Sequence, residues 1–78
     1  MDLKIGRKYI DNKSSINFGL TVVIKEKIVY GIFKKYKIEV IKNPKTPKSY
    51  SKNKEYKMSE TILQRYFTPY QNSIKKVE

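Results

Sequence analysis

Apolar and polar residues alternate along the first half of the chain in the pattern of β-strands. The alternation is cleanest over residues 36–42, where one face is apolar and the other is mostly charged, as in a strand with one buried and one wet side. Residues 18–30 alternate too, but the pattern changes phase near residues 26–28, which indicates a bulge or bend in a long, curved strand. Residues 7–10 form a shorter candidate strand.

Polar, turn-forming segments separate these expected strands. Residues 11–15 consist of Asp, Asn, Lys and two Ser, which favour a turn or loop. Gly31 and residues 32–35 are expected to connect the two long strands. Residues 43–55 hold two of the three prolines and little apolar mass. They predict a loop that is longer than most connections in a compact domain.

A short strand and a short helix are expected near the end of the sequence. The strand covers residues 56–58. Ser59 suits a helix N-cap, and the apolar residues within 61–67 recur at helical spacing. Residues 67–70 follow as a last edge strand, and residues 71–78 are expected to be a flexible polar tail.

These elements together predict a mainly β protein. Four to five short antiparallel strands, with one helical turn before the last of them, fit a small SH3-like barrel, because closing the sheet protects its edges. The main competing fold is a three-stranded antiparallel sheet with one helix across a face. The length of 78 residues allows one domain at most, which we place at residues 1–70.

Composition removes several classes of function. The chain has neither His nor Cys, so the usual general base, the thiol nucleophile and the common zinc ligands are all missing. The acidic residues are scattered along the chain, and the three glycines lie far apart. The sequence therefore predicts a protein that is not an enzyme and that carries no metal or cofactor. No segment is long and apolar enough to span a membrane.

Charge points to an acidic partner. The chain has 18 basic and seven acidic residues, a formal net charge of +11, and all the basic residues except Arg7 and Arg65 are lysines. Such a field attracts nucleic acid or an acidic protein surface. The alternative is that AT-rich coding has enriched the chain in Lys, Ile, Asn and Tyr, so that part of the charge serves no ligand.

Two basic clusters are the candidate binding residues, and we expect them to converge on one positive face. Lysines interspersed with aromatic residues hold nucleic-acid backbones and stack on bases, although a run of charge is also typical of a merely solvated surface. The candidates for binding nucleic acid or an acidic partner are Lys34, Lys35, Lys37, Lys42, Lys45, Lys48, Tyr50, Lys52, Lys54, Lys57 and Arg65.

Four segments occur in a familiar order: Gly6-x-x-Tyr9-Ile10-Asp11-Asn12, Thr21-Val22-Val23-Ile24-Lys25, Tyr36-Lys37-Ile38-Glu39-Val40 and Met58-Ser59-Glu60-x-x-Leu63-x-x-Tyr66-Phe67. Over roughly residues 5–70 this order resembles the small SH3-like barrel proteins of bacteriophages and mobile elements of low-GC Gram-positive bacteria. The resemblance implies a barrel, a mobile-element origin and a place in the cytoplasm of a bacterial host. The chain lacks the Ala-Leu-Tyr-Asp-Tyr stretch and the Trp of peptide-binding SH3 domains, which argues against polyproline binding.

Two functions from different classes follow. The first is a non-enzymatic module that binds DNA or RNA mainly through phosphates. The alternative is a phage-type accessory or inhibitor protein that docks on an acidic surface of a host protein that handles nucleic acid. In that case the apolar residues Ile32, Phe33 and Ile41 would anchor the contact. A third hypothesis is an assembly protein that pairs through a sheet edge. Neither a membrane nor a small-molecule substrate is expected as a partner.

Overall fold

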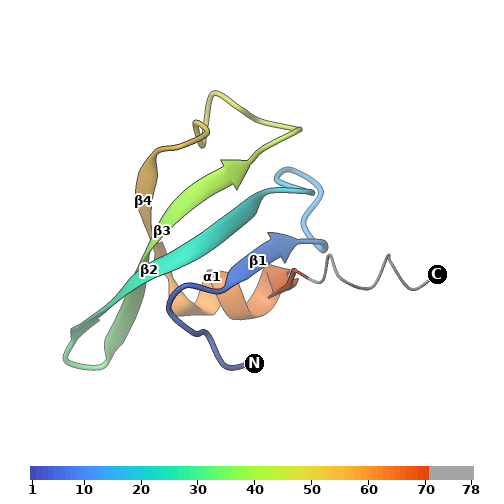
Figure 1. The fold of residues 1–78 in the computed structure, drawn as a ribbon. Coiled ribbons are helices and arrows are strands. Elements are labelled where there is room, and N and C mark those ends of the chain that lie inside the picture. The colour runs from blue at the N-terminus through green and yellow to red at the C-terminus, as the bar shows by residue number, and fades with distance from the viewer. Residues whose placement is uncertain (71–78) are drawn as a thin grey trace.

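The computed structural model describes residues 1–70 and contains five strands and one short helix (Figure 1). In chain order the elements are β1 (Lys8–Asp11), β2 (Thr21–Tyr30), β3 (Phe33–Lys42), β4 (Glu55–Ser59), α1 (Glu60–Tyr66) and β5 (Phe67–Pro69). The strands form one antiparallel sheet in the order β4-β3-β2-β1-β5. The predicted mainly β class and the helix before the last strand are confirmed, and the competing three-stranded sheet is wrong. The tail expected over residues 71–78 lies outside the described residues.

The sheet is curved but not closed. Within residues 1–70, no ladder joins the two edge strands β4 and β5. α1 follows β4 directly and leads directly into β5, so it carries the chain from one edge to the other (Figure 1). Ser59 begins the helix as its N-cap and accepts a hydrogen bond from the Ile62 backbone N–H at 3.2 Å, as expected for this residue type.

The bend in β2 comes from one extra residue. Ile24 pairs with Ile38 and Glu26 pairs with Lys37, so Lys25 is left without a partner in the ladder. A bulge of this kind bends a strand and increases its twist. The change of phase that the sequence shows near residue 26 is therefore a bulge, just before the expected position. Beyond Ile24, β2 pairs with β3 alone.

The concave side of the sheet holds the core, and α1 contributes to it. β2 and β3 supply alternate residues to this side, as the pattern predicts. The only buried residue of α1 is Leu63. The buried apolar residues are Tyr9, Leu20, Val22, Ile24, Tyr36, Ile38, Val40, Met58, Leu63 and Phe67.

The connection predicted over residues 32–35 is wrong. Tyr30 pairs directly with Phe33, so a two-residue turn at Gly31–Ile32 joins β2 to β3, and residues 33–35 belong to β3. Gly31 has φ +58°, a conformation that suits glycine in tight hairpin turns. The hairpin extends past the rest of the sheet (Figure 1), where neither face has a core to contact, so the expected alternation is lost.

Candidate nucleic-acid interface

The long loop between β3 and β4 is folded by its own hydrogen bonds. We call residues 43–54 the basic loop; the predicted loop ended one residue later, but Glu55 belongs to β4. The Asn43 side chain donates to the backbone carbonyls of Thr46 and Tyr50 at 2.7 and 3.3 Å and accepts from the Thr46 N–H at 3.1 Å. Asn53, at φ +68°, donates its N–H to the Val40 carbonyl at 2.8 Å. These bonds give the loop a defined shape.

A second set of contacts fixes the basic loop to the β1–β2 loop, residues 12–20. The Thr46 hydroxyl donates to Asn17 Oδ1 at 2.8 Å. Gly19, at φ +93°, lies so close to Pro44 that a Cβ at position 19 would be 2.7 Å from Pro44 Cγ. Only glycine fits this approach without displacing the proline. The two loops therefore support each other.

Tyr50, within the basic loop, packs its side chain against the core. Its ring meets the Tyr56 ring edge to face, with centroids 5.1 Å apart, a favourable arrangement for aromatic pairs. The Tyr56 hydroxyl accepts a hydrogen bond from the Ser51 N–H at 2.8 Å. Tyr50 is half-buried and packs against the core, so part of its role is structural, which the sequence did not indicate.

Lys42 at the end of β3 and the four lysines of the basic loop are exposed on this scaffold. Residues 40–54 contain five lysines and no acidic residue, and every one of those lysines is exposed. Within the part of the chain that the structure describes, none of them forms an ion pair. The lysines concerned are Lys42, Lys45, Lys48, Lys52 and Lys54.

On the convex face of the sheet, by contrast, lysines alternate with glutamates. Lys25 lies 3.5 Å from Glu39, and Lys37 lies 3.5 Å from Glu26. Lys57 on β4 is directly opposite Lys37 and just beyond the basic loop. Because these carboxylates partly neutralise the face, it is a weaker site for a polyanion than the basic loop.

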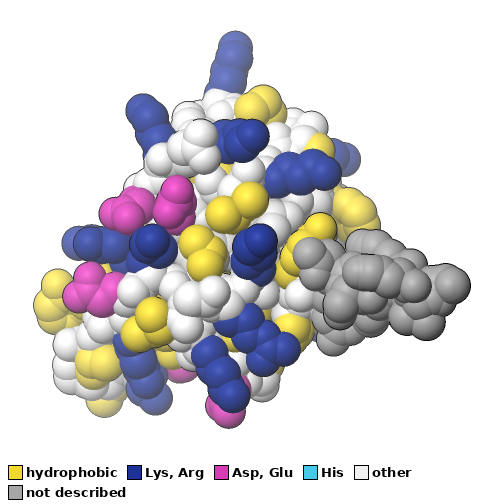
Figure 2. Space-filling view, in the orientation of Figure 1, with side chains coloured by type: hydrophobic (Ala, Val, Ile, Leu, Met, Phe, Trp, Pro, Cys, Tyr) yellow, Lys and Arg dark blue, Asp and Glu magenta, His cyan; other side chains and the backbone are white. Residues whose placement is uncertain are grey.

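The two predicted basic clusters do not converge. Lys34 and Lys35 lie near the end of the β2–β3 hairpin, and the rise of a strand separates Lys35 from Lys42 by about 23 Å. As successive strand residues, they also point to opposite faces. Arg65 is exposed in the last turn of α1. Figure 2 shows Lys and Arg side chains spread over the visible face, with no single positive patch.

The end of the β2–β3 hairpin is apolar and exposed. Ile32 is 88% exposed and Phe33 67% exposed, as expected for a docking surface, and Val29 and Tyr30 beside them are more than half exposed. In Figure 2 hydrophobic side chains are visible at this end of the molecule. Ile41 does not join them: it is half-buried at the other end of β3, next to a shift in the β2–β3 register. The structure therefore does not bring Ile41 together with Ile32 and Phe33.

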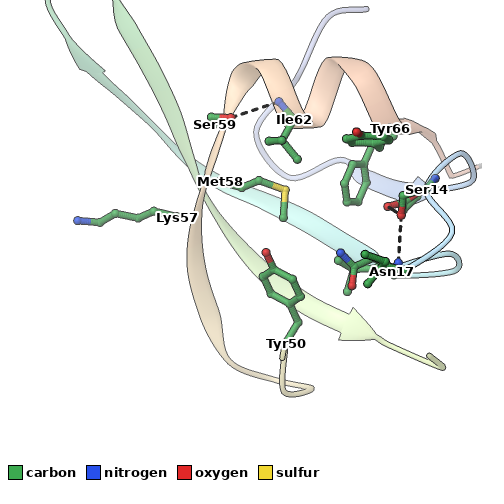
Figure 3. Close-up of a pocket in the computed structure, with 12 residues that line it drawn as sticks. Ser14, Asn17, Tyr50, Lys57, Met58, Ser59, Ile62 and Tyr66 are labelled. Atoms are coloured by element: carbon green, nitrogen blue, oxygen red, sulfur yellow. Dashed lines mark hydrogen bonds between the residues drawn. The ribbon is translucent and has the colours of Figure 1, made fainter. Parts of the chain in front are cut away.

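A pocket of about 340 Å³ opens beside the basic loop (Figure 3). The β1–β2 loop, Tyr50, β4 and α1 surround it. Figure 3 shows the Tyr50 ring directed toward Met58 and Ile62 placed on the helix side, whereas Lys57 points away from the pocket. Sequence reasoning missed this site because its walls come from three stretches that are far apart in the sequence, within residues 11–20, at Tyr50 and within residues 57–67. They are lined by Asp11, Ser14, Ile16, Asn17, Leu20, Tyr50, Lys57, Met58, Ser59, Ile62, Tyr66 and Phe67.

The Asp11 carboxylate in this pocket accepts three hydrogen bonds from neighbouring residues. It is 2% exposed, and its oxygens accept hydrogen bonds from the backbone N–H groups of Lys13 and Ser14 and from the Ser14 hydroxyl, at 2.8 to 3.1 Å. In contrast, the hydroxyls of Tyr50 and Tyr66 and Nδ2 of Asn17 form no hydrogen bond within residues 1–70. The pocket thus combines apolar walls with three polar groups available to a ligand.

Among residues 1–70, no three acidic side chains gather closely enough to hold a metal ion. α1, the single helix in this part of the chain, has seven residues, and no helix there could cross a membrane.

Comparisons with protein-family models, curated proteins and solved structures found no match to this chain.

Proposed function

We propose that the protein binds nucleic acid through its phosphates, with the basic loop as the principal contact. The observation that carries this proposal is the loop together with Lys42 at the end of β3: five exposed lysines stand on a hydrogen-bonded scaffold with no carboxylate between residues 40 and 54. Lysines that neutralise phosphates release condensed counterions, and this release drives binding that is insensitive to sequence. A loop that is already folded loses less conformational entropy on binding than a mobile one.

Salt dependence of binding tests this proposal. We would titrate a fluorescein-labelled 12-mer oligothymidylate with protein at several NaCl concentrations and follow anisotropy. The triple variant Lys45→Gln, Lys48→Gln, Lys52→Gln should bind more weakly and reduce the slope of log K against log[salt] by up to about two units, since each lost phosphate contact removes about 0.7.

A matched variant separates the basic loop from net charge. Lys27→Gln, Lys34→Gln, Lys35→Gln removes the same charge from the end of the β2–β3 hairpin. We expect it to retain most of the wild-type slope. Equal losses in the two triple variants would show that overall charge and not the loop governs binding, and no binding by the wild type would rule the proposal out.

We also infer that the fold is a partly open SH3-like barrel. The strand order β4-β3-β2-β1-β5, the bulge that bends β2 and the helix that joins the edge strands support this assignment. A bacteriophage or mobile-element origin remains the proposal that the sequence resemblance implies. An experimental structure in which β5 lies far from β4 would contradict the barrel.

A second candidate function is docking on an acidic host protein, and the exposed hairpin end favours it. Ile32 and Phe33 would fill an apolar hollow in the partner, while the neighbouring Lys34 and Lys35 would meet its acidic rim. This candidate predicts a single co-purifying protein that survives nuclease and 0.5 M NaCl. The double variant Ile32→Ser, Phe33→Ser should lose that protein, whereas the lysine-to-glutamine triple variant of the basic loop should keep it.

A further inference from the structure

Tyr50 connects the pocket to the lysines of the basic loop. Tyr50 lines the pocket, and Lys48 and Lys52 flank Tyr50 in the sequence. A phosphate backbone in contact with these lysines would therefore pass near the pocket. At about 340 Å³, the pocket is at the small end of ligand sites and suits one small ring system.

The lining favours a base over a phosphate or an aliphatic side chain. Asp11 contributes a buried carboxylate that repels phosphate, although its own hydrogen bonds are complete. An aliphatic group would make no use of the hydroxyls of Tyr50 and Tyr66 or of Nδ2 of Asn17, which form no hydrogen bond within residues 1–70. A nucleobase has flat faces for the aromatic and thioether walls and an edge with donors and acceptors for these three groups.

We infer that this pocket receives one unstacked base of a single-stranded nucleic acid, while the basic loop holds the adjoining phosphates. The inference rests on the proposed function and adds a preference for single strands. A base inside a duplex cannot enter the pocket unless it is first flipped out of the stack.

Paired oligonucleotides with the same charge test the inference. One is a 12-mer oligothymidylate, and the other is a 12-mer in which every nucleotide is an abasic tetrahydrofuran phosphate. Anisotropy titrations at a fixed NaCl concentration should give about tenfold tighter binding of the oligothymidylate, the usual effect of one stacked base. Equal affinities for the two would overturn the inference and leave the proposed function intact, whereas no binding of either would remove both.

Variants that block the pocket make the test specific. Ile62→Trp places an indole at the mouth of the pocket, at a position on α1 that is already 39% exposed. Ile16→Trp does the same from the β1–β2 loop, where residue 16 is 67% exposed. Whichever of them melts like the wild type should bind the two oligonucleotides equally, with the affinity for the abasic one unchanged. If both fold and both keep the preference for bases, the inference is wrong.

A competing occupant is an aliphatic side chain of a partner protein. Two small probes distinguish it: thymidine 5′-monophosphate and N-acetyl-leucinamide. Chemical shifts of the Met58 methyl group, which lines the pocket, report entry of either probe. Shifts with the nucleotide support the inference, and Tyr50→Phe should weaken them by removing one hydroxyl. Shifts that arise with the leucine derivative alone would overturn it.

Discussion

Thr46 and Asn17, which are 29 residues apart in the sequence, are joined by a hydrogen bond of 2.8 Å from the threonine hydroxyl to Oδ1 of the asparagine. This bond ties the basic loop to the β1–β2 loop. In the proposed function the first loop would supply lysines for phosphates, and the second forms one wall of the pocket. Their relative position decides whether a backbone and its base can be bound together, so this contact is the first to test.

Thr46→Val should loosen the junction of the two loops without unfolding the protein. Valine keeps the shape of threonine but cannot donate to Asn17, and we expect a loss of about 1 kcal/mol in the free energy of unfolding. Hydrogen exchange at the Ser49 and Tyr50 amides, which both bond to the Thr46 carbonyl, should become faster. Urea unfolding and exchange measured by NMR check both effects.

Thr61→Val is the matched control, because Thr61 is exposed on α1. It makes the same chemical change away from the loop junction and should leave exchange at Ser49 and Tyr50 as in the wild type. Unchanged exchange in Thr46→Val itself would mean that the other bonds of the basic loop suffice to hold it.

The sequence predicts well those elements in which one face is buried, because apolar and polar residues then recur with the period of the element. In β3, Tyr36, Ile38 and Val40 are buried as their alternation requires, and Ser59 caps α1 as its residue type suggests. Prediction failed at the start of β3, because residues 33–35 are all exposed and no periodic burial marks them as strand.

The candidate site was less accessible to sequence reasoning. The lysines of the basic loop are visible as a charge run, but a charge run does not reveal whether its loop is ordered. That order comes from Asn43, Thr46 and Asn17, polar residues that are also typical of disordered loops. The pocket depends on segments brought together only by the fold, and Ile41 is half-buried, like Lys37 and Glu39 before it on the same face of β3.

Gly19→Ala should be costly because two penalties coincide. An alanine at φ +93° is strained, and its Cβ would lie 2.7 Å from Pro44 Cγ. We expect a loss of about 2–4 kcal/mol in the free energy of unfolding. Gly6→Ala is the control: residue 6 has φ +86°, and a Cβ added there would have nothing within 4 Å, so it should cost only about 1–2 kcal/mol.

Pro44→Ala isolates the contact between the two loops. In the double variant with Gly19→Ala, the clash is removed while the strain remains, so the pair should be coupled by about 1 kcal/mol in a double-mutant cycle. Additive effects, or equal costs at Gly6 and Gly19, would contradict the close approach.

Lys57→Glu should stabilise the sheet at low ionic strength. Lys57 lies directly opposite Lys37, and like charges in such positions are destabilising. Glutamate would give Lys37 a second acidic neighbour besides Glu26 and should add about 0.2–1 kcal/mol to the free energy of unfolding. Thermal melts at 10 mM and 1 M NaCl measure the effect, which salt should abolish.

Lys52→Glu provides the comparison for this substitution. It changes the net charge by the same amount in the basic loop, where no strand partner faces it. A gain as large as that of Lys57→Glu would assign the effect to the reduction of overall charge, and the cross-strand pair would then contribute nothing measurable.

Tyr36→Phe should give a loss of stability that depends on pH. Burial raises the pKa of Tyr36 above its ordinary value of 10, and the nearby Glu60 carboxylate, to which the hydroxyl donates at 3.2 Å, raises it further. The folded state therefore holds this proton more tightly than the unfolded chain. The resulting stability is fully present below pH 10 and is lost as pH rises above 10 through the pKa of the folded state.

Urea unfolding of the wild type and Tyr36→Phe at pH 7, 9, 10 and 11 measures this loss. At pH 7 the wild type should be more stable by about 1 kcal/mol, the usual contribution of one hydrogen bond. That difference should shrink above pH 10, because only the wild type must keep a buried phenol protonated. Deprotonation of lysines affects both proteins equally and cancels in the difference between their free energies of unfolding. The matched control is Tyr30→Phe, which alters a phenol that is 62% exposed. A difference that stays constant from pH 7 to 11 would show that Tyr36 is not held protonated by its position against Glu60.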